Sequence, residues 1–303
     1  MQSETGYKLV QLASGAYSVR SLSYRETFHP VIGPVAEAEA LYVRQLRLGD
    51  RIFAERDAFV IWDVGLGAAA NVLTVLRATQ KISARVRVLS FDCTIEPLRF
   101  ALQHSQQLGY LNGYETAAQR LVSDNRVSFI NGAQTIDWEW VPADFPSLLR
   151  NCASRTLAKP HAILFDAFSP AKNPAMWTLP LFTDLYRLLD PRRPCALATY
   201  SRSTMLRASL LIAGFFVGIG HATGEKEETT IAANTLDLID EPLGRRWLQR
   251  ARKSSSAEPL CEPHYRQHPL SSASWEKLCT HPQFATAQTL GEARWPRVIE
   301  TDQ

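Results

Sequence analysis

Hydrophobic positions along the 303-residue chain follow three successive patterns. In residues 1–57, two alternating runs, Tyr7–Leu12 and Tyr17–Leu22, flank a Ser-Gly pair and predict a β-hairpin, and residues 34–46 predict a helix. From residue 58 to 240, short continuous apolar runs alternate with amphipathic stretches, which predicts buried strands separated by helices. After residue 240 this alternation ends.

The central region predicts an α/β fold. The predicted strands span residues 58–64, 85–91, 126–130, 161–165, 195–200, 215–218 and 229–233. The predicted helices span residues 68–79, 95–108, 175–189 and 203–213. An aromatic-rich connection with Trp138 and Trp140 lies between the third and fourth strands. Strands that alternate with helices predict a Rossmann-like, mostly parallel sheet with helices on both faces.

Residues 241–303 predict a C-terminal extension. Residues 243–253 have the pattern of a basic amphipathic helix, followed by a serine- and proline-rich linker and a short helix near residues 274–279. We therefore expect an N-terminal hairpin and helix over residues 1–57, a Rossmann-like domain over residues 58–240, and this extension.

Composition excludes several classes of protein. A hydrophobic content of 46% excludes disorder as the main state, and 33 Lys and Arg against 30 Asp and Glu is too small an excess to indicate a nucleic-acid binder by itself. The five cysteines are widely spread, with no C-x-x-C pair, which favours a reducing compartment. With no signal peptide and no apolar run of membrane-spanning length, we expect a cytoplasmic protein without a membrane partner.

The turn after the first central strand carries candidate chemistry, because ligands of open parallel sheets bind beyond the carboxyl ends of the strands. Asp63 is followed by Gly65 and Gly67, and the string also fits the G-x-G-x-x-A dinucleotide fingerprint. However, a carboxylate at Asp63 would repel a pyrophosphate and attract a positive ligand, such as the amino and sulfonium groups of S-adenosylmethionine. Asp92 ends the next strand, where an acid accepts hydrogen bonds from ribose hydroxyls. The turn therefore favours S-adenosyl-L-methionine as the cofactor.

The most distinctive stretch, "DAFSPAKNPAMWTLPLF", starts at Asp166 and places an acid before a loop with two prolines and two large aromatic residues. This stretch resembles the signature of the MnmC-type methyltransferases, which complete 5-methylaminomethyl-2-thiouridine at the wobble position of tRNA. The segments "ETFHPVIGPVAEAEALYV", "DVGLGAAANVL", "SFDCTIEPL" and "ATYSRSTMLRASLLIAGFFV" agree with the same family in the same order. The resemblance covers about residues 7 to 235.

The resemblance implies the fold of a class I S-adenosylmethionine-dependent methyltransferase and roles for further residues. Glu37 and Asn71 would join the cofactor site. Asp166 would be catalytic, because it could orient the acceptor amine and accept or relay its proton. The residues expected to bind the substrate, by walling the pocket or meeting a phosphate, are Phe168, Lys172, Trp177 and Tyr200.

The chain departs from the family pattern at three places. Ala68-Ala69 stands where the family usually has a threonine, Asp92 stands where glutamate is common, and the turn at residues 224–228 is unusually acidic. The resemblance implies the methylating half alone, as a stand-alone domain without the FAD-dependent oxidase domain. The implied partner is the tRNA anticodon loop, with an amine precursor from a separate oxidase or directly from the upstream modification enzyme.

Several alternatives stay open at this point. The chain could transfer a methyl or aminopropyl group to a small amine, or be a non-catalytic RNA-binding or cofactor-sensing protein. Cys261, His264 and His268 have the residue types of a zinc site, but the spacing disfavours one, and we expect no metal. His29 either touches the site or packs under the hairpin. Two arginine groups, residues 44–51 and 245–253, could flank the pocket or cover solvated helix faces.

Overall fold

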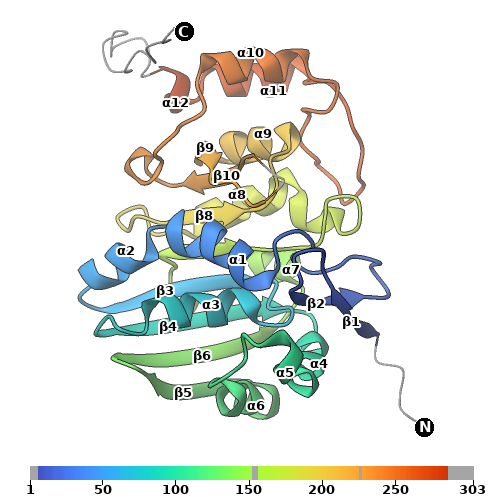
Figure 1. The fold of residues 1–303 in the computed structure, drawn as a ribbon. Coiled ribbons are helices and arrows are strands. Elements are labelled where there is room, and N and C mark those ends of the chain that lie inside the picture. The colour runs from blue at the N-terminus through green and yellow to red at the C-terminus, as the bar shows by residue number, and fades with distance from the viewer. Residues whose placement is uncertain (1–5, 152–155, 225–226, 286–303) are drawn as a thin grey trace, which may run out of the picture.

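In the computed structural model, residues 6–151, 156–224 and 227–285 are described. They form a two-stranded hairpin and an eight-stranded sheet with helices on both faces (Figure 1). The hairpin strands are β1 (Tyr7–Gln11) and β2 (Tyr17–Ser21). The strands of the large sheet are β3 (Ala58–Val64), β4 (Ala84–Asp92), β5 (Arg126–Asn131), β6 (Gln134–Pro142), β7 (Ala162–Phe165), β8 (Ala196–Thr199), β9 (Phe216–Gly220) and β10 (Thr229–Ala233).

The helices cover the sheet in two layers. The N-terminal part contains α1 (Pro34–Ala38), the π-helix η1 (Glu39–Arg44), α2 (Leu48–Ala54), α3 (Ala70–Thr79), α4 (Glu96–Gln103), α5 (Ser105–Leu108), α6 (Glu115–Asp124) and α7 (Phe145–Arg150). The rest of the chain contains the 3₁₀ turns η3 (Pro174–Trp177) and η4 (Leu236–Leu238), and the helices α8 (Leu179–Leu188), α9 (Thr204–Ala213), α10 (Arg245–Lys253), α11 (Ser272–Cys279) and α12 (Pro282–Ala285).

The strand order is β5-β6-β4-β3-β7-β8-β10-β9. The five strands from β6 to β8 are parallel, whereas β5 at one edge and β10 and β9 at the other run antiparallel to their neighbours. The mostly parallel α/β fold expected from the sequence is thereby confirmed. A parallel sheet of this kind places the carboxyl ends of β3, β4, β7 and β8 along one edge.

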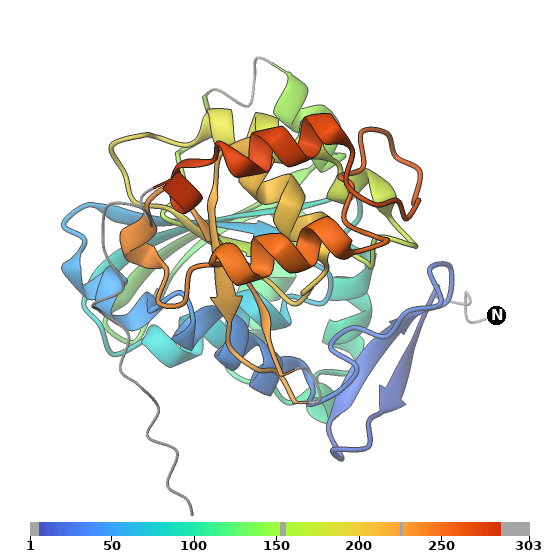
Figure 2. The same cartoon turned by 90° about the horizontal axis from the view of Figure 1, so that it is seen from above.

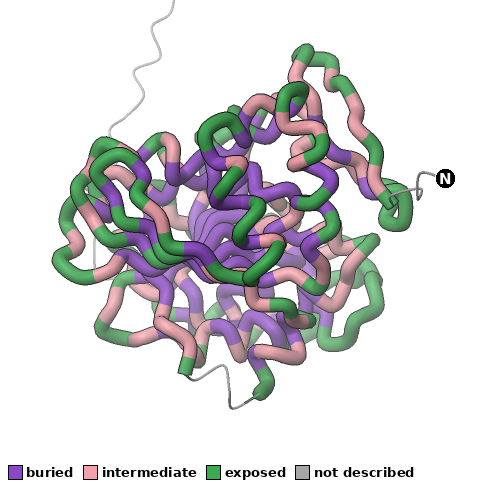
Figure 3. Tube along the Cα trace, turned by 90° about the horizontal axis from the view of Figure 1, so that it is seen from below, coloured by how far each residue is buried: buried purple, intermediate pink, exposed green. Residues whose placement is uncertain are grey.

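The central strand shows why the sheet is covered on both sides. In β3, Phe59 and Ile61 face a core shared with α1, α3 and α4, whereas Val60, Trp62 and Val64 face a second core shared with α8 and α9. Because successive side chains of a strand point to opposite faces, the continuous apolar run fills both cores. Figure 3 shows a buried centre surrounded by segments that are partly or fully exposed.

Two features of the β4–β7 connection were not predicted. The segment expected as an aromatic-rich connection forms β6, which pairs in parallel with β4, so the predicted third strand becomes the outer antiparallel strand β5. In β6, the buried residues Gln134, Ile136 and Trp138 alternate with exposed polar ones. A strand pattern with a polar exposed half is typical of a position near a sheet edge. Helices α6 and α7 were also not predicted.

The C-terminal region packs on the second core. Trp247, Leu248, Leu260 and Leu278 are buried in the same cluster as α8 and α9, so the segment expected as a linker is ordered against the domain. The Gln283 side chain also hydrogen-bonds both the amide and the carbonyl of Val217 on edge strand β9. Figure 2 shows α10 and α11 lying above α9. Within the described ranges, none of the helices combines the length and apolar character needed to cross a bilayer.

Candidate active site

A cavity of about 520 Å³ lies at the carboxyl ends of the parallel strands. Its walls come from the turns after β3, β4, β7 and β8 and from residues 24–30, which follow the hairpin. Five carboxylates line it, against two arginines and one histidine: Glu26, Glu37, Asp92, Asp144 and Asp166, with Arg20, Arg25 and His29. Such a lining favours a ligand or substrate that carries positive charge.

Two positions of the turn after β3 require glycine, because neighbouring protein atoms lie too close to the backbone for a side chain. Gly65 has φ +97°, and a Cβ atom there would lie 2.6 Å from the Asp166 carbonyl oxygen. Gly67 has φ +48°, and a Cβ atom there would press on the Phe28 ring at 3.3 Å. The turn leads into α3, whose first residues, Ala70 and Asn71, line the cavity. Only glycine therefore allows the turn to pack this closely against the loop after β7 and against Phe28.

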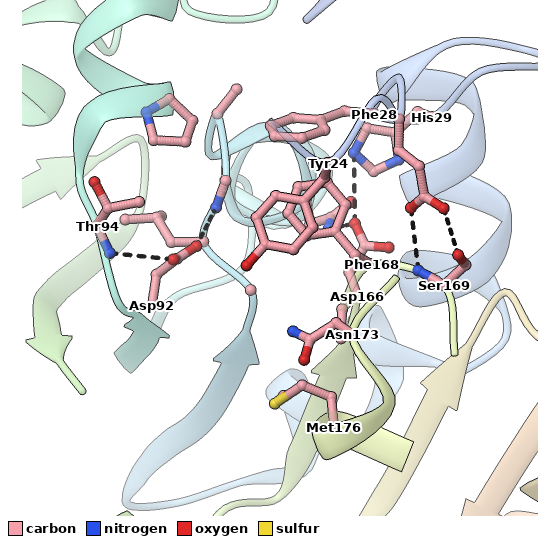
Figure 4. Close-up of a pocket in the computed structure, with 18 of the residues that line it drawn as sticks. Tyr24, Phe28, His29, Asp92, Thr94, Asp166, Phe168, Ser169, Asn173 and Met176 are labelled. Carbon is pink, nitrogen blue, oxygen red and sulfur yellow. Dashed lines mark hydrogen bonds and ion pairs between the residues drawn. The ribbon is translucent and has the colours of Figure 1, made fainter. Parts of the chain in front are cut away.

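Asp92 closes the cavity on the β4 side. Its carboxylate accepts the amide hydrogens of Gly67, at 3.0 Å, and of Thr94, at 3.3 Å (Figure 4). Burial raises the pKa of Asp92, and the amide hydrogen bonds oppose that shift. The acid expected at the second strand tip therefore lies against the glycine turn, where a ribose would have to bind.

Asp63 lies behind the cavity wall. Its exposed fraction is 1%, Ser90 Oγ donates a hydrogen bond to its Oδ2 at 2.7 Å, and its Oδ1 has no hydrogen-bond partner within the described part of the chain. Burial raises the pKa of Asp63 well above its usual range. The expectation that Asp63 faces the ligand is therefore wrong: residue 63 shares the strand face of Phe59 and Ile61 and points toward the helices.

Asp166, the predicted catalytic residue, follows β7 and lines the cavity. Asn71 Nδ2 donates to its Oδ2 at 2.8 Å, and His29 Nε2 lies 3.6 Å from the same oxygen. His29 Nδ1 in turn lies 3.4 Å from Glu37 Oε1. Three segments far apart in sequence thereby meet at one carboxylate (Figure 4).

Aromatic residues cover the opening. The Phe168 ring stacks on Tyr24, with centroids 4.1 Å apart, and lies 5.6 Å from the Phe28 ring. Two hydrogen bonds fix the backbone beside it, from Trp177 Nε1 to the Phe168 carbonyl at 2.8 Å and from Tyr200 Oη to the Ala167 carbonyl at 2.9 Å. The result is a flat apolar surface beside Asp166.

Most of the predicted site residues meet at this cavity. The ones that line it are Glu37, Gly65, Gly67, Asn71, Asp92, Asp166, Phe168 and Tyr200. Trp177 does not wall it as expected, because its side chain is buried beneath Phe168 and packs edge-on against Phe165. Lys172 is exposed and lies outside the lining.

The arginines of residues 44–51 are not at the cavity. Arg51 donates to the carbonyl of His161, directly before β7, and to that of Pro194, two residues before β8. That places it at the amino ends of these strands, across the sheet from the site. In the second arginine group, Arg252 lies over the Trp275 ring of α11 at 5.1 Å.

Residues 24–29 are the part of the site that sequence reasoning missed. Tyr24, Glu26 and Phe28 all line the cavity, and His29 contacts Asp166. Only the His29 position was considered, with two open interpretations, and the structure supports contact with the site. Among the residues described, no group of three or more His, Cys, Asp or Glu side chains is arranged to hold a metal ion.

The geometry fits a positively charged cofactor. Asn71 Oδ1 is buried without a hydrogen-bond partner in the described ranges, and its residue lines the cavity. Gly65 and Gly67 line the cavity without side chains, so a ligand can approach the backbone of the turn. An unpaired acceptor, open glycine turns and an acidic wall together suit the amino and sulfonium groups of S-adenosyl-L-methionine.

Comparison with known proteins agrees with this reading. A family model described as S-adenosyl-L-methionine-dependent methyltransferase matches residues 143–235. The "tRNA 5-methylaminomethyl-2-thiouridine biosynthesis bifunctional protein MnmC" of Pseudoalteromonas atlantica is 27% identical over 233 residues, covering 72% of the chain and 32% of that protein. The protein of the same name in Aeromonas hydrophila is 30% identical over 212 residues, covering 64% of the chain and 30% of that protein.

The chain thus spans about a third of the length of these relatives. The crystal structure of MnmC2 from Aquifex aeolicus shares the fold, with a TM-score of 0.67 and 22% identity over 92% of this chain and 85% of that one. With the acidic, glycine-lined cavity, the family model and the two sequence relatives identify the chain as an S-adenosyl-L-methionine-dependent methyltransferase that is similar to the MnmC proteins.

Proposed function

We propose that the enzyme methylates the aminomethyl group of 5-aminomethyl-2-thiouridine at the wobble position of tRNA. The observation that carries the proposal is Asp166, a carboxylate held beside the glycine turn of an acidic cavity. The relatives named above are described as acting in 5-methylaminomethyl-2-thiouridine biosynthesis. A site that must hold both a cationic methyl donor and an amine needs such acids.

The cofactor would lie along the turn after β3. Gly65 and Gly67 present bare backbone to it, Asn71 offers an unpaired oxygen, and Asp92 is placed for ribose hydroxyls. Glu37 adds a further carboxylate to the wall. When bound, S-adenosyl-L-methionine supplies a methyl group activated by its positively charged sulfur.

Asp166 would prepare the acceptor amine. A primary amine is mostly protonated near neutral pH and has no lone pair for attack until it loses a proton. The Asp166 side chain is 18% exposed, so it reaches the cavity and can orient the amine and accept that proton. A carboxylate is a weak base, and we expect most of the rate to come from alignment of the reacting atoms.

The aromatic surface would hold the nucleobase. The Tyr24 and Phe168 rings offer flat faces at the opening, and Tyr200 closes the wall next to Asp166. A wobble uridine is unpaired in the anticodon loop, so turning it into a pocket costs little. The candidates for phosphate contacts are the exposed Lys172 and Arg25, the half-buried Arg20 and the arginines of α10.

Nucleoside mass spectrometry tests the proposal. In a strain that lacks the enzyme, tRNA should accumulate 5-aminomethyl-2-thiouridine, and the purified protein with S-adenosyl-L-methionine should methylate that tRNA. Unchanged tRNA in the deletion strain would remove the proposal. The acidic cavity also suits a small free amine, and methylation or aminopropylation of such an amine without RNA would favour that second function.

A further inference from the structure

His29 lies between two carboxylates and has no role in the reaction proposed above. Nδ1 faces Glu37 Oε1 at 3.4 Å and Nε2 faces Asp166 Oδ2 at 3.6 Å. The side chain is 8% exposed, so solvent satisfies little of the ring. A neutral imidazole has one donor and one acceptor nitrogen, whereas both nitrogens are donors in the imidazolium. Two facing carboxylates therefore select the protonated ring.

The backbone supports a functional reason for this placement. His29 has φ +48°, in the left-handed region that residues other than glycine seldom adopt, and it directly precedes Pro30. Strain of this kind persists where surrounding structure over-determines it, often at a functional site. Here the surrounding structure includes Phe28, whose backbone amide donates to the Val19 carbonyl of the hairpin. The hairpin thereby holds in place the segment that carries the His29 imidazole.

Titratable groups from several elements surround the pair of carboxylates that holds His29. The acids whose charges act on His29 are Glu37 of α1, Asp63 of β3 and Asp166 after β7. Tyr42 of η1 and Tyr200 after β8 lie near Glu37 and Asp166. Burial raises the pKa of both tyrosines and of Asp63, so these three groups stay protonated and uncharged. Burial alone would lower the pKa of His29, but Asp166 and Glu37 raise it to about 9. The balance is one imidazolium against two carboxylates.

We propose that His29 is a positioning residue, an imidazolium bridge that keeps Asp166 ionised and fixes the rotation of its carboxylate. Asn71 and His29 both contact Oδ2 of Asp166, so they define one orientation of the group. The inference rests on the proposed role of Asp166 as proton acceptor. In that step an N–H bond of the acceptor ammonium breaks, an O–H bond forms at Asp166, and His29 keeps its own proton.

A titration of the protein alone tests the charge. The ring ¹⁵N shifts of His29, assigned by their loss in His29→Gln, should stay those of an imidazolium through neutral pH and change near pH 9. His264→Gln is the matched control, because His264 is exposed and outside the site. A His29 ring that titrates near the ordinary value of 6.5 would overturn the bridge. This readout needs neither cofactor nor substrate, so it stands even if the proposed substrate is wrong.

Kinetics test the positioning. We expect His29→Gln to lower kcat for tRNA methylation by about 10- to 100-fold, with cofactor affinity changed by less than about threefold. The wild-type kcat should fall as pH rises through the His29 pKa of about 9, and this alkaline limb should be absent in the variant. His264→Gln should keep both the rate and the limb.

Variants at His29, Asp166 and Glu37 distinguish failure of the His29 role from failure of the Asp166 role. If Asp166→Asn loses activity but His29→Gln keeps the wild-type rate and pH profile, the positioning role is wrong and the role of Asp166 stands. If His29→Gln does not fold, Glu37→Gln removes one of the two carboxylates while the imidazole stays. That variant should lower the pH at which the His29 ring loses its proton, and an unchanged titration would contradict the bridge.

Discussion

Glu26 accepts the backbone amide hydrogen of Ser169 at 3.1 Å, and it also accepts the Ser169 hydroxyl, across 143 residues of sequence. The pair ties the segment after the hairpin to the loop that follows Asp166. Tyr24 stacks on Phe168 beside the same contact. The opening of the cavity is therefore built from two distant segments, and its geometry depends on a carboxylate that sequence reasoning did not consider.

Replacing this carboxylate should loosen the opening without affecting the cofactor site. We expect Glu26→Gln to raise KM for the tRNA acceptor by about three- to tenfold, because two charge-assisted hydrogen bonds become neutral ones. Cofactor affinity, measured by calorimetry, should change by less than about twofold. Glu39→Gln, an exposed position on η1, is the control. Weakened cofactor binding with an unchanged KM for tRNA would contradict this prediction, because it would show that Glu26 supports the cofactor site and not the opening.

Asp166→Asn should separate chemistry from binding. Asparagine keeps the shape of the side chain but cannot accept the amine proton as a carboxylate does, so kcat should fall by about 100- to 10,000-fold. Binding of S-adenosyl-L-methionine, measured by calorimetry, should persist within about threefold. Asp124→Asn, at an exposed site on α6, should leave both unchanged. Retained cofactor affinity together with undiminished turnover in Asp166→Ala would remove the catalytic role.

The strand tips could be predicted because they depend on local pattern. Continuous apolar runs that end in an acid place Asp92 and Asp166 at the carboxyl edge of a parallel sheet, and the structure puts both at the cavity. The strict alternation within β3 also carries the information that Asp63 shares the face of Ile61. If the same alternation is followed to the last residues of the strand, it predicts that Asp63 lies behind the cavity wall.

The rest of the site depends on contacts that no local pattern encodes. His29 reaches Asp166 only because its backbone takes a positive φ, and nothing in the spacing of residues 24–30 indicates that. Strand β6 is a different case, because its buried residues alternate with polar ones and this period-2 pattern is itself typical of a half-buried strand. The position of His29 thus depends on tertiary contacts, whereas β6 was predictable from its local pattern.

Asp63→Asn should make the free enzyme more stable near neutral pH and leave cofactor binding nearly unchanged. Burial raises the pKa of Asp63 above its unfolded value, so the unfolded chain loses this proton first and the free energy of unfolding falls as pH rises between the two values. Asparagine removes that cost and can still accept the Ser90 hydroxyl. Because the raised pKa already keeps Asp63 neutral in the folded enzyme, the substitution removes no charge near neutral pH, and binding of the cationic cofactor should change little.

Urea unfolding and calorimetry at several pH values measure both effects. The difference in unfolding free energy between Asp63→Asn and wild type should grow as pH rises above the ordinary aspartate pKa. Over the same range, the affinities of the two proteins for S-adenosyl-L-methionine should stay close to each other, because Asp63 carries no charge in the folded wild type. Equal stability of the two proteins at every pH would show that Asp63 is not neutral in the folded enzyme.

Trp177 and Phe168 should show opposite effects, because one supports the pocket and the other forms its surface. Trp177→Phe loses the hydrogen bond to the Phe168 carbonyl and part of a fully buried ring, and should lower the free energy of unfolding by about 2 kcal/mol. Phe168→Leu lies at the opening and should raise KM for tRNA by about tenfold with little loss of stability, because a stacking surface is removed. Urea unfolding and steady-state kinetics on both variants distinguish the roles. A large increase in KM for tRNA in Trp177→Phe, at unchanged stability, would show that Trp177 forms part of the pocket wall.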